Sequence, residues 1–371
     1  MLIGVPLETV AGETRVAVTP ETAKKLVAQG HQLAVQSGAG VAASATDAAY
    51  EAAGAGITDR AGALGCELVL KVRSPDADEL SLMKSGSALV GLLNPFDKDN
   101  LQRLASAGLT SFALEAAPRT TRAQSMDVLS SQANLAGYKA VMMAADKYQR
   151  LFPMLMTAAG TIKAARVVVL GVGVAGLQAI ATAKRLGAMV EATDVRPDTK
   201  EQVESLGAKF IDVPLTDAEK ELAKGQGGYA RDMGEDYKKR QAALIAERIK
   251  QADIVITTAL IPGRPAPVLV TEDMVKTMRQ GSVIVDMAVE QGGNCPLSEI
   301  DRTVVKHGVH LVGIANIPAL VAADASALYA RNLLNFLALM LDPKTGEFKL
   351  NREDEIVAGT LACSGGELAR K

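Results

Sequence analysis

The sequence is poor in the residues that mark disulfide-rich, metal-binding and nucleic-acid-binding proteins. It has no tryptophan, only 3% aromatic residues and three cysteines, Cys66, Cys295 and Cys363, which lie far apart. Their odd number and spacing give neither a disulfide framework nor a zinc motif, so we expect free thiols in a reducing compartment. The formal charge of −2 and the pI of about 6.0 provide no overall basic field, so we expect no nucleic acid partner.

Histidine is scarce as well, with only His31, His307 and His310. His307 and His310 are close in sequence, but no third ligand is in view, so we predict no metal site. A dehydrogenase that reduces a carbonyl needs a proton donor beside the hydride donor, and histidine commonly fills that role. A hydride passed between two nicotinamide rings needs no proton, only alignment of the rings.

Long apolar runs are few. The longest uncharged stretch, residues 167–183, contains three glycines and begins a strand–turn–helix pattern, which argues against a membrane span. The apolar stretch 332–341 is too short to span a bilayer, and no basic segment follows Met1 as a signal peptide requires. We therefore expect a cytoplasmic chain with no transmembrane segment of its own.

What the chain has in quantity is aliphatic residues, within a hydrophobic share of 48%. This composition is typical of parallel strands buried under alanine-rich helices, and the length favours two domains. Strand-like and helix-like segments alternate along the chain, and residues 15–19 are among the predicted strands. We predict an α/β fold of two Rossmann-like, doubly wound parallel-sheet domains with a cleft between them. The first is expected to span 1–128 and to be completed by 305–371, and the NAD(H)-binding domain to span 129–304.

A glycine-rich turn, GVGVAG at residues 171–176, follows one predicted strand and begins a helix. Such glycines permit a tight turn, let the backbone approach a pyrophosphate and pack the helix against the strand. Asp194 ends the next predicted strand, where a carboxylate accepts hydrogen bonds from both ribose hydroxyls. It would repel a 2′-phosphate, which favours NAD(H) over NADP(H), although Arg196 offers a cation that tolerates the phosphate. A purely structural glycine turn is the alternative.

The predicted cofactor contacts come from this turn, from the loop of the acidic residue and from two later loops. They are Gly171, Val172, Gly173, Val174, Gly176, Asp194, Val195, Arg196, Gly228, Tyr229 and Leu260. Gly228 and Tyr229 belong to the glycine-flanked segment 227–234, which suggests a lid whose single aromatic residue covers a ligand. A plain surface loop is the alternative for that segment.

A second polar stretch, PRTTRAQSMDVLSSQ at residues 118–132, interrupts the aliphatic chain. Arg119, Gln124, Asp127 and Ser130 offer donors and acceptors suited to a carboxamide or a phosphate. A solvated loop between domains explains the same composition, so both interpretations stay open here.

These motifs sit in long strings that resemble the NAD(H)-binding component, domain I, of the proton-translocating nicotinamide nucleotide transhydrogenases. The similar strings are residues 118–140, 170–188, 193–210, 257–275 and 281–299. Alanine dehydrogenase is a related family with the same two-domain fold and glycine loop. The resemblance implies that this component binds NADH and that a partner component binds NADP(H). Hydride then passes directly between the nicotinamides, coupled to proton translocation across the membrane.

The resemblance also implies residue roles and partners. Arg119 and Asp127 would fix the carboxamide, Ser130 would add a hydrogen bond, Gln124 would reach toward the second nucleotide, and Tyr229 would close over the bound nucleotide. The chain would be a separate subunit or an excised domain, peripherally attached to the inner membrane through membrane-spanning and NADP(H)-binding components. It would form a homodimer, with an exchanged hairpin expected in residues 152–167.

The sequence departs from alanine dehydrogenase at one position. That family has a catalytic histidine in a segment resembling residues 88–101, and Asn94 stands there in this chain. Arg15 and Lys71, which resemble its substrate contacts, are present, and we assign them no catalytic role. Without the histidine, pyruvate amination lacks its acid/base group. A soluble, alanine dehydrogenase-like amino-acid dehydrogenase and a non-catalytic NAD-sensing module remain the alternatives.

Overall fold

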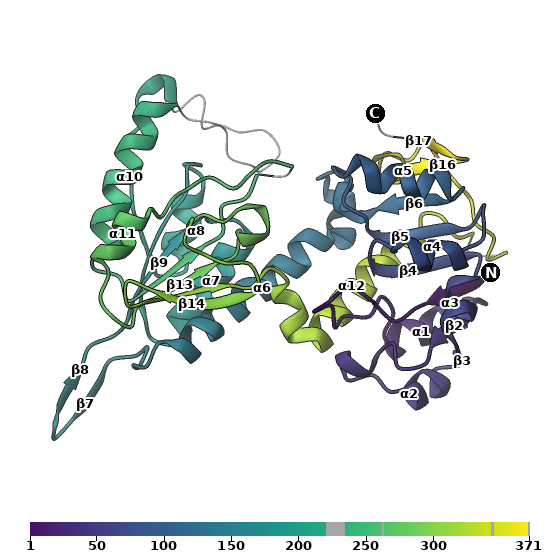
Figure 1. Cartoon of the computed structure of the whole chain (residues 1–371), viewed down its shortest axis with the longest axis horizontal. Coiled ribbons are helices and arrows are strands. Elements are labelled where there is room, and N and C mark those ends of the chain that lie inside the picture. Colours follow the sequence, from purple (N-terminus) through teal and green to yellow (C-terminus); the bar gives the residue numbers. More distant parts are fainter. Residues whose placement is uncertain (220–233, 262, 343–344, 370–371) are drawn as a thin grey trace. The chain divides into compact units, whose positions relative to one another are not determined.

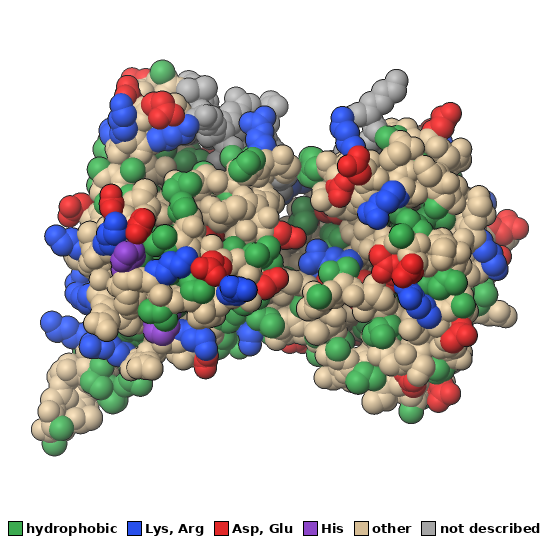
Figure 2. Space-filling model, viewed as in Figure 1, with side chains coloured by type: hydrophobic (Ala, Val, Ile, Leu, Met, Phe, Trp, Pro, Cys, Tyr) green, Lys and Arg blue, Asp and Glu red, His purple; other side chains and the backbone are tan. Residues whose placement is uncertain are grey.

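The computed structural model describes residues 1–219, 234–261, 263–342 and 345–369. The chain forms two compact units, and each has its own sheet and core (Figure 1). The first unit combines Met1–Gln132 with Pro318–Lys371, and the second is Ala133–Ile317. Figure 2 shows acidic and basic side chains interspersed over the visible face of both units.

The first unit is built on an eight-stranded sheet with the order β17-β16-β6-β5-β4-β1-β2-β3. Strands β1 to β6 run parallel, and β16 and β17 add an antiparallel edge. The strands are β1 (Leu2–Val5), β2 (Gln32–Gln36), β3 (Gly56–Thr58), β4 (Leu68–Arg73), β5 (Ala88–Leu92), β6 (Thr110–Ala113), β16 (Leu361–Ser364) and β17 (Glu367–Leu368). The helices are α1 (Pro20–Ala28), α2 (Asp47–Ala52), α3 (Arg60–Leu64), α4 (Ala77–Leu82), α5 (Lys98–Ser106), α12 (Ala322–Leu337) and α13 (Glu355–Thr360).

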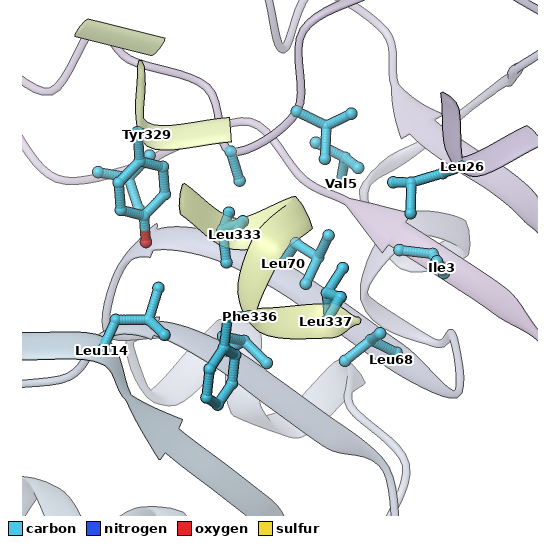
Figure 3. Close-up of a cluster of buried hydrophobic side chains, with 14 of the residues drawn as sticks. Ile3, Val5, Leu26, Leu68, Leu70, Leu114, Tyr329, Leu333, Phe336 and Leu337 are labelled. Carbon is cyan, nitrogen blue, oxygen red and sulfur yellow. The ribbon is translucent and has the colours of Figure 1, made fainter. Parts of the chain in front are cut away.

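Helix α12 returns from the C-terminal part of the chain to cover the first sheet. In Figure 3 its Leu333, Phe336 and Leu337 lie among strand residues such as Leu68 and Leu70. All five side chains are buried, so this helix supplies part of the core that the N-terminal segment cannot complete alone. The first unit is therefore discontinuous in sequence.

The second unit has a seven-stranded sheet with the order β11-β10-β9-β12-β13-β15-β14. Only the edge strand β14 runs antiparallel to its neighbour. The strands are β9 (Arg166–Leu170), β10 (Met189–Thr193), β11 (Lys209–Phe210), β12 (Ile254–Thr257), β13 (Val283–Asp286), β14 (Arg302–Lys306) and β15 (Val309–Gly313). The helices are α6 (Val128–Lys147), whose first turn belongs to the first unit, α7 (Val174–Arg185), α8 (Thr199–Ser205), α10 (Glu235–Ile249) and α11 (Glu272–Thr277).

Two sequence-based expectations are wrong. The sequence pattern assigns residues 305–317 to the first domain, but β15 pairs with β13 in the second sheet, where Val309 and Leu311 are fully buried. Residues 15–19 form no strand and instead run beside α12, where the amide N–H of Val16 donates to the Ser326 hydroxyl at 3.0 Å. In both cases an apolar run is buried, but the sequence does not say against which partner.

A two-stranded ribbon extends from the second unit (Figure 1). It consists of β7 (Leu155–Thr157) and β8 (Gly160–Ile162), which pair antiparallel. Every residue of both strands is exposed. Within the described part of the chain, no helix is both long enough and apolar enough to cross a lipid bilayer.

Candidate nucleotide-binding site

The glycine turn joins β9 to α7 at the carboxyl end of the second sheet. Gly171 has a φ of +98°, and a Cβ there would lie 2.6 Å from Thr258 Oγ1. A Cβ on Gly176 would lie 2.0 Å from the carbonyl oxygen of Gly171, whereas one on Gly173 would meet open space. Gly171 and Gly176 are therefore required by packing, and Gly173 leaves its backbone accessible to a ligand.

The N-terminus of α7 carries no side-chain cap. Gly173 is the N-cap residue, and the helix begins at Val174, which is 39% exposed. The first amide groups of a helix have no partner within the helix, and the helix dipole places partial positive charge there. An uncapped, glycine-lined helix start suits a phosphate group.

Asp194 lies directly beside this turn. Its Oδ2 accepts a hydrogen bond from the amide N–H of Val172 at 2.7 Å, and its Oδ1 accepts from the amide N–H of Arg196 at 2.9 Å. The Arg196 side chain also donates to it, through Nε to Oδ1 at 2.9 Å and through Nη2 to Oδ2 at 2.8 Å. The structure thus brings together the turn and the acidic loop that the sequence predicts separately.

The electrostatics of this cluster favour an ionised carboxylate. Burial alone would raise the pKa of Asp194, but the hydrogen bonds and charge of Arg196 and the amide of Val172 outweigh it, so the pKa lies below its ordinary value. The Asp194 carboxylate in turn raises the pKa of Arg196. An ionised Asp194 is an acceptor for hydroxyl donors and repels anions.

The remaining predicted contacts have different settings. Val172 is buried in the core of the second unit, and Val195 packs against Val213 and Tyr237. Leu260 is 39% exposed, beyond the end of β12. The other two predicted contacts, Gly228 and Tyr229, lie outside the described residues.

Three residues that sequence reasoning missed hold the loop after β12 beside the glycine turn. The Thr258 hydroxyl donates to the carbonyl of Gly171 at 2.9 Å. Asn294, which is fully buried, accepts from the amide N–H of Ala259 at 3.1 Å and donates to its carbonyl at 2.9 Å. Asp286, also fully buried, accepts from the amide N–H of Asn294 at 3.1 Å. The signal in the sequence is an aspartate that ends a buried strand and is followed by Gly-Gly-Asn.

The second polar stretch lies in the first unit, at the start of α6. Asp127 precedes this helix, and its carboxylate accepts from the amide N–H of Ser130 at 2.9 Å and from the Ser130 hydroxyl at 2.6 Å. This is the geometry of a helix N-cap, so Asp127 and Ser130 have a structural role whatever else they bind. Arg119 and Gln124 are both exposed on the preceding segment, and the Gln124 carbonyl accepts from the Asp127 amide N–H at 3.3 Å.

Arg15 and Lys71 already have carboxylate partners inside the first unit. Arg15 Nη2 lies 2.6 Å from Glu13 Oε2, and Lys71 Nζ lies 2.7 Å from Glu79 Oε1 and 3.4 Å from Glu8 Oε2. All five side chains are almost fully buried. Each cation is thus matched by a protein carboxylate, which leaves little positive charge for a substrate carboxylate.

Asn94 and His307 have no arrangement suited to acid/base or metal chemistry. Asn94 has a φ of +50°, and its amide N–H donates to Glu115 at 2.6 Å. His307 lies on the surface, with Nε2 2.8 Å from Glu272 Oε1. Among the residues that the structure describes, no group of three or more His, Cys, Asp or Glu side chains is placed to hold a metal ion.

The chain matches two family models that together cover nearly its whole length. Residues 4–136 match the alanine dehydrogenase/PNT N-terminal domain, and residues 140–371 match the alanine dehydrogenase/PNT C-terminal domain. The chain belongs to the alanine dehydrogenase/PNT family. The predicted resemblance and the α/β fold are thus confirmed.

Within the family, the transhydrogenase branch is more similar than the alanine dehydrogenases. The first part of the divided NAD(P) transhydrogenase subunit alpha from Rhodospirillum rubrum is 54% identical, with 99% of this chain and 97% of that protein covered. The crystal structure of transhydrogenase from Sinorhizobium meliloti has 48% identity and a TM-score of 0.90, covering 99% of this chain and 100% of that one. Alanine dehydrogenase from Halomonas elongata is 31% identical, with 98% and 94% covered.

Proposed function

We propose that this chain is the NAD(H)-binding component of a proton-translocating transhydrogenase. It transfers hydride between NADH, which it binds itself, and NADP⁺ bound on a partner component, and this transfer is coupled to proton translocation across the membrane. The observation that carries the proposal is the glycine turn of residues 171–176, held to Asp194 by the 2.7 Å hydrogen bond from Val172. The identity of 54% to a transhydrogenase alpha subunit over 99% of the chain supports the same function.

Asp194 is proposed to select NAD(H). Its carboxylate accepts from the two adenosine ribose hydroxyls, and the pyrophosphate meets the backbone at Gly173 and the start of α7. A 2′-phosphate would meet a negative charge instead of an acceptor. NADP(H) is therefore assigned to the partner component.

The second polar stretch is proposed to orient the nicotinamide ring. Bound NADH supplies the hydride, and the chain supplies only alignment, because transfer between two nicotinamides needs no proton. Arg119, Asp127 and Ser130 hold the carboxamide, and Gln124 extends toward the second nucleotide. The Asp127–Ser130 contact at the start of α6 fixes two of these groups in advance, and such orientation lowers a barrier by several kcal/mol.

The partners follow from the same proposal. The Rhodospirillum rubrum relative is named as one part of a subunit, and we propose that this chain likewise docks on NADP(H)-binding and membrane-spanning components at the cytoplasmic face of the membrane. A homodimer is proposed through the β7–β8 ribbon. This ribbon exposes Leu155, Met156 and Ile162, and an isolated two-stranded hairpin is marginally stable in water.

The alternative of an amino-acid dehydrogenase is disfavoured by the first unit. Asn94 stands where that family has a catalytic histidine, and the cations of Arg15 and Lys71 are matched by Glu13, Glu8 and Glu79. No observation favours the NAD-sensing module over the transhydrogenase component, so an activity measurement has to separate them.

The test uses the purified chain with and without the NADP(H)-binding partner. NADH binding is first followed by a fluorescence titration, and hydride transfer to an NADP⁺ analogue is then measured. We expect NADH binding in both cases and transfer only with the partner. Turnover with pyruvate and ammonia would identify an amino-acid dehydrogenase, and binding without any transfer would identify a sensing module.

A further inference from the structure

The Asp194 carboxylate is already saturated with hydrogen bonds in the structure of the chain alone. Oδ1 accepts from the backbone N–H and the Nε of Arg196, both at 2.9 Å, and Oδ2 accepts from the Val172 N–H at 2.7 Å and from Arg196 Nη2 at 2.8 Å. A carboxylate offers about four acceptor positions. A ribose therefore finds no vacant position on this residue.

The four donors are of two kinds. The N–H groups of Val172 and Arg196 are part of the backbone and stay in place as long as the turn and loop keep their fold. The other two donors, Nε and Nη2, form a fork, which we call the Arg196 fork, with one donor on each carboxylate oxygen. Two neighbouring ribose hydroxyls that both donate to Asp194 need the same arrangement, one donor on each oxygen. The fork thus occupies the positions that the diol requires.

We infer that the Arg196 fork is an internal competitor of the adenosine ribose, and that it has to leave Asp194 before NAD(H) is bound. The inference rests on the proposed function, because it concerns the same nucleotide site. Leaving Asp194 also breaks the bond from Arg196 Nη2 to the Val172 carbonyl at 3.1 Å. The Arg196 side chain is 23% exposed, so it has a path toward solvent, whereas the Asp194 side chain is only 7% exposed.

The competition also affects the choice between nucleotides. A 2′-hydroxyl can replace a fork donor with a hydrogen bond of its own. A 2′-phosphate has no proton to donate at neutral pH in its dianionic form, so it displaces the fork only by drawing the guanidinium to itself. Arg196 therefore weakens binding of the diol and is the group that a 2′-phosphate would recruit.

The test is Arg196→Gln in the full chain, which removes the charge and the fork and keeps a polar side chain. We expect the affinity for NADH, measured by isothermal titration calorimetry, to rise about threefold to tenfold, since an exposed to half-buried ion pair is removed from the competition. Arg196→Lys retains one donor and is expected to lie between wild type and Arg196→Gln. The affinity for NADPH is expected to fall or stay unchanged.

Small ligands isolate the ribose. The gain in Arg196→Gln should appear with 5′-AMP, which carries the diol, and vanish with 2′,3′-dideoxy-AMP, which does not. A merely structural role of Arg196 would change both affinities alike. Lys200→Gln is the matched control, because Lys200 pairs with Asp212 at 2.7 Å on the surface of the same region, and it should bind like wild type.

The outcomes separate the inference from the function. If wild type binds NADH but Arg196→Gln binds it equally or more weakly with an unchanged melting temperature, Arg196 is a ligand or a structural clip and the inference is wrong. If Arg196→Gln loses its cooperative melting, Arg196→Lys decides, and an affinity for 5′-AMP no higher than wild type overturns the inference. If wild type binds no NADH, the proposed function itself fails.

Discussion

The two units use the same kind of sheet but fill its central crevice differently. In the first sheet the strand order reverses between β1 and β4, and in the second between β9 and β12. Doubly wound sheets bind ligands at the carboxyl ends of the strands at such points. In the first unit Glu8 follows β1, accepts from the amide N–H of Val72 at 2.6 Å and lies 3.4 Å from Lys71. In the second unit the corresponding positions hold the glycine turn and Thr258.

This difference shows how one fold comes to bind a ligand in one copy and not in the other. The first crevice is filled by the protein's own buried charges, and burial raises the pKa of Glu8 above its ordinary value even though Lys71 and two backbone amides oppose it. The second crevice is lined by backbone without side chains. A fold with both arrangements in one chain separates the effect of the glycines from that of the sheet.

Removing the charge that fills the first crevice should have the largest effect. Lys71→Met leaves the buried carboxylates of Glu8 and Glu79 without their cation, which we expect to lower the free energy of unfolding by about 3–5 kcal/mol. Urea unfolding measures this change, and an NADH titration should show unchanged affinity of the folded protein. Lys25→Met is the control, since Lys25 forms only an exposed pair with Glu21. Weakened NADH binding in folded Lys71→Met would contradict the separation of the two crevices.

The glycines of the second crevice should respond unequally. Gly176→Ala places a Cβ 2.0 Å from the Gly171 carbonyl oxygen, so we expect a loss of about 3 kcal/mol in unfolding free energy together with loss of NADH binding. At Gly173 the same substitution meets open space, so Gly173→Ala should melt like wild type and still bind NADH about tenfold more weakly, because the methyl group stands where the ligand approaches. Equal melting and equal affinity in both variants would show that the turn binds nothing.

Asp194→Asn sharpens the comparison at the level of one carboxylate. The amide has a single acceptor oxygen, so one ribose hydroxyl loses its partner, and we expect the NADH affinity to fall about tenfold to hundredfold. The affinity for NADPH should fall less, because the repulsion of the 2′-phosphate is removed as well. Titrations with both nucleotides measure the two changes, and Asp212→Asn on the surface is the control. Full retention of NADH affinity would remove Asp194 from the site.

The sequence predicts the second crevice better than the rest of the molecule because its signals are local. A strand, a glycine turn, a helix and an aspartate at the end of the next strand follow one another within one βαβ unit, and the structure joins them through the contact between Val172 and Asp194. The hydrogen bonds of Asp286 and Asn294 connect loops from different strands. Such contacts depend on strand order, which a local pattern does not contain.

The same limit explains the two wrong assignments. Val309 and Leu311 have the alternation of a half-buried strand, which fits the edge of either sheet, and only the pairing of β15 with β13 places them in the second unit. Val16 and Val18 alternate in the same way, yet they are buried in a segment that lies beside α12. Burial can be predicted from these residues, but the partner that buries them is more than 200 residues away in one case and belongs to the other sheet in the other.

The smallest effect on the molecule itself is expected at Gln124. Its side chain is exposed, so Gln124→Ala should leave the melting temperature and the NADH affinity unchanged. If this side chain reaches the second nucleotide, as proposed, hydride transfer in the presence of the NADP(H)-binding partner should still slow about tenfold, the size of one lost positioning contact. Ser125→Ala, at the exposed neighbouring position, is the control. Unchanged partner-dependent transfer in Gln124→Ala would leave Arg119, Asp127 and Ser130 as the proposed orienting groups and restrict the second polar stretch to NADH alone.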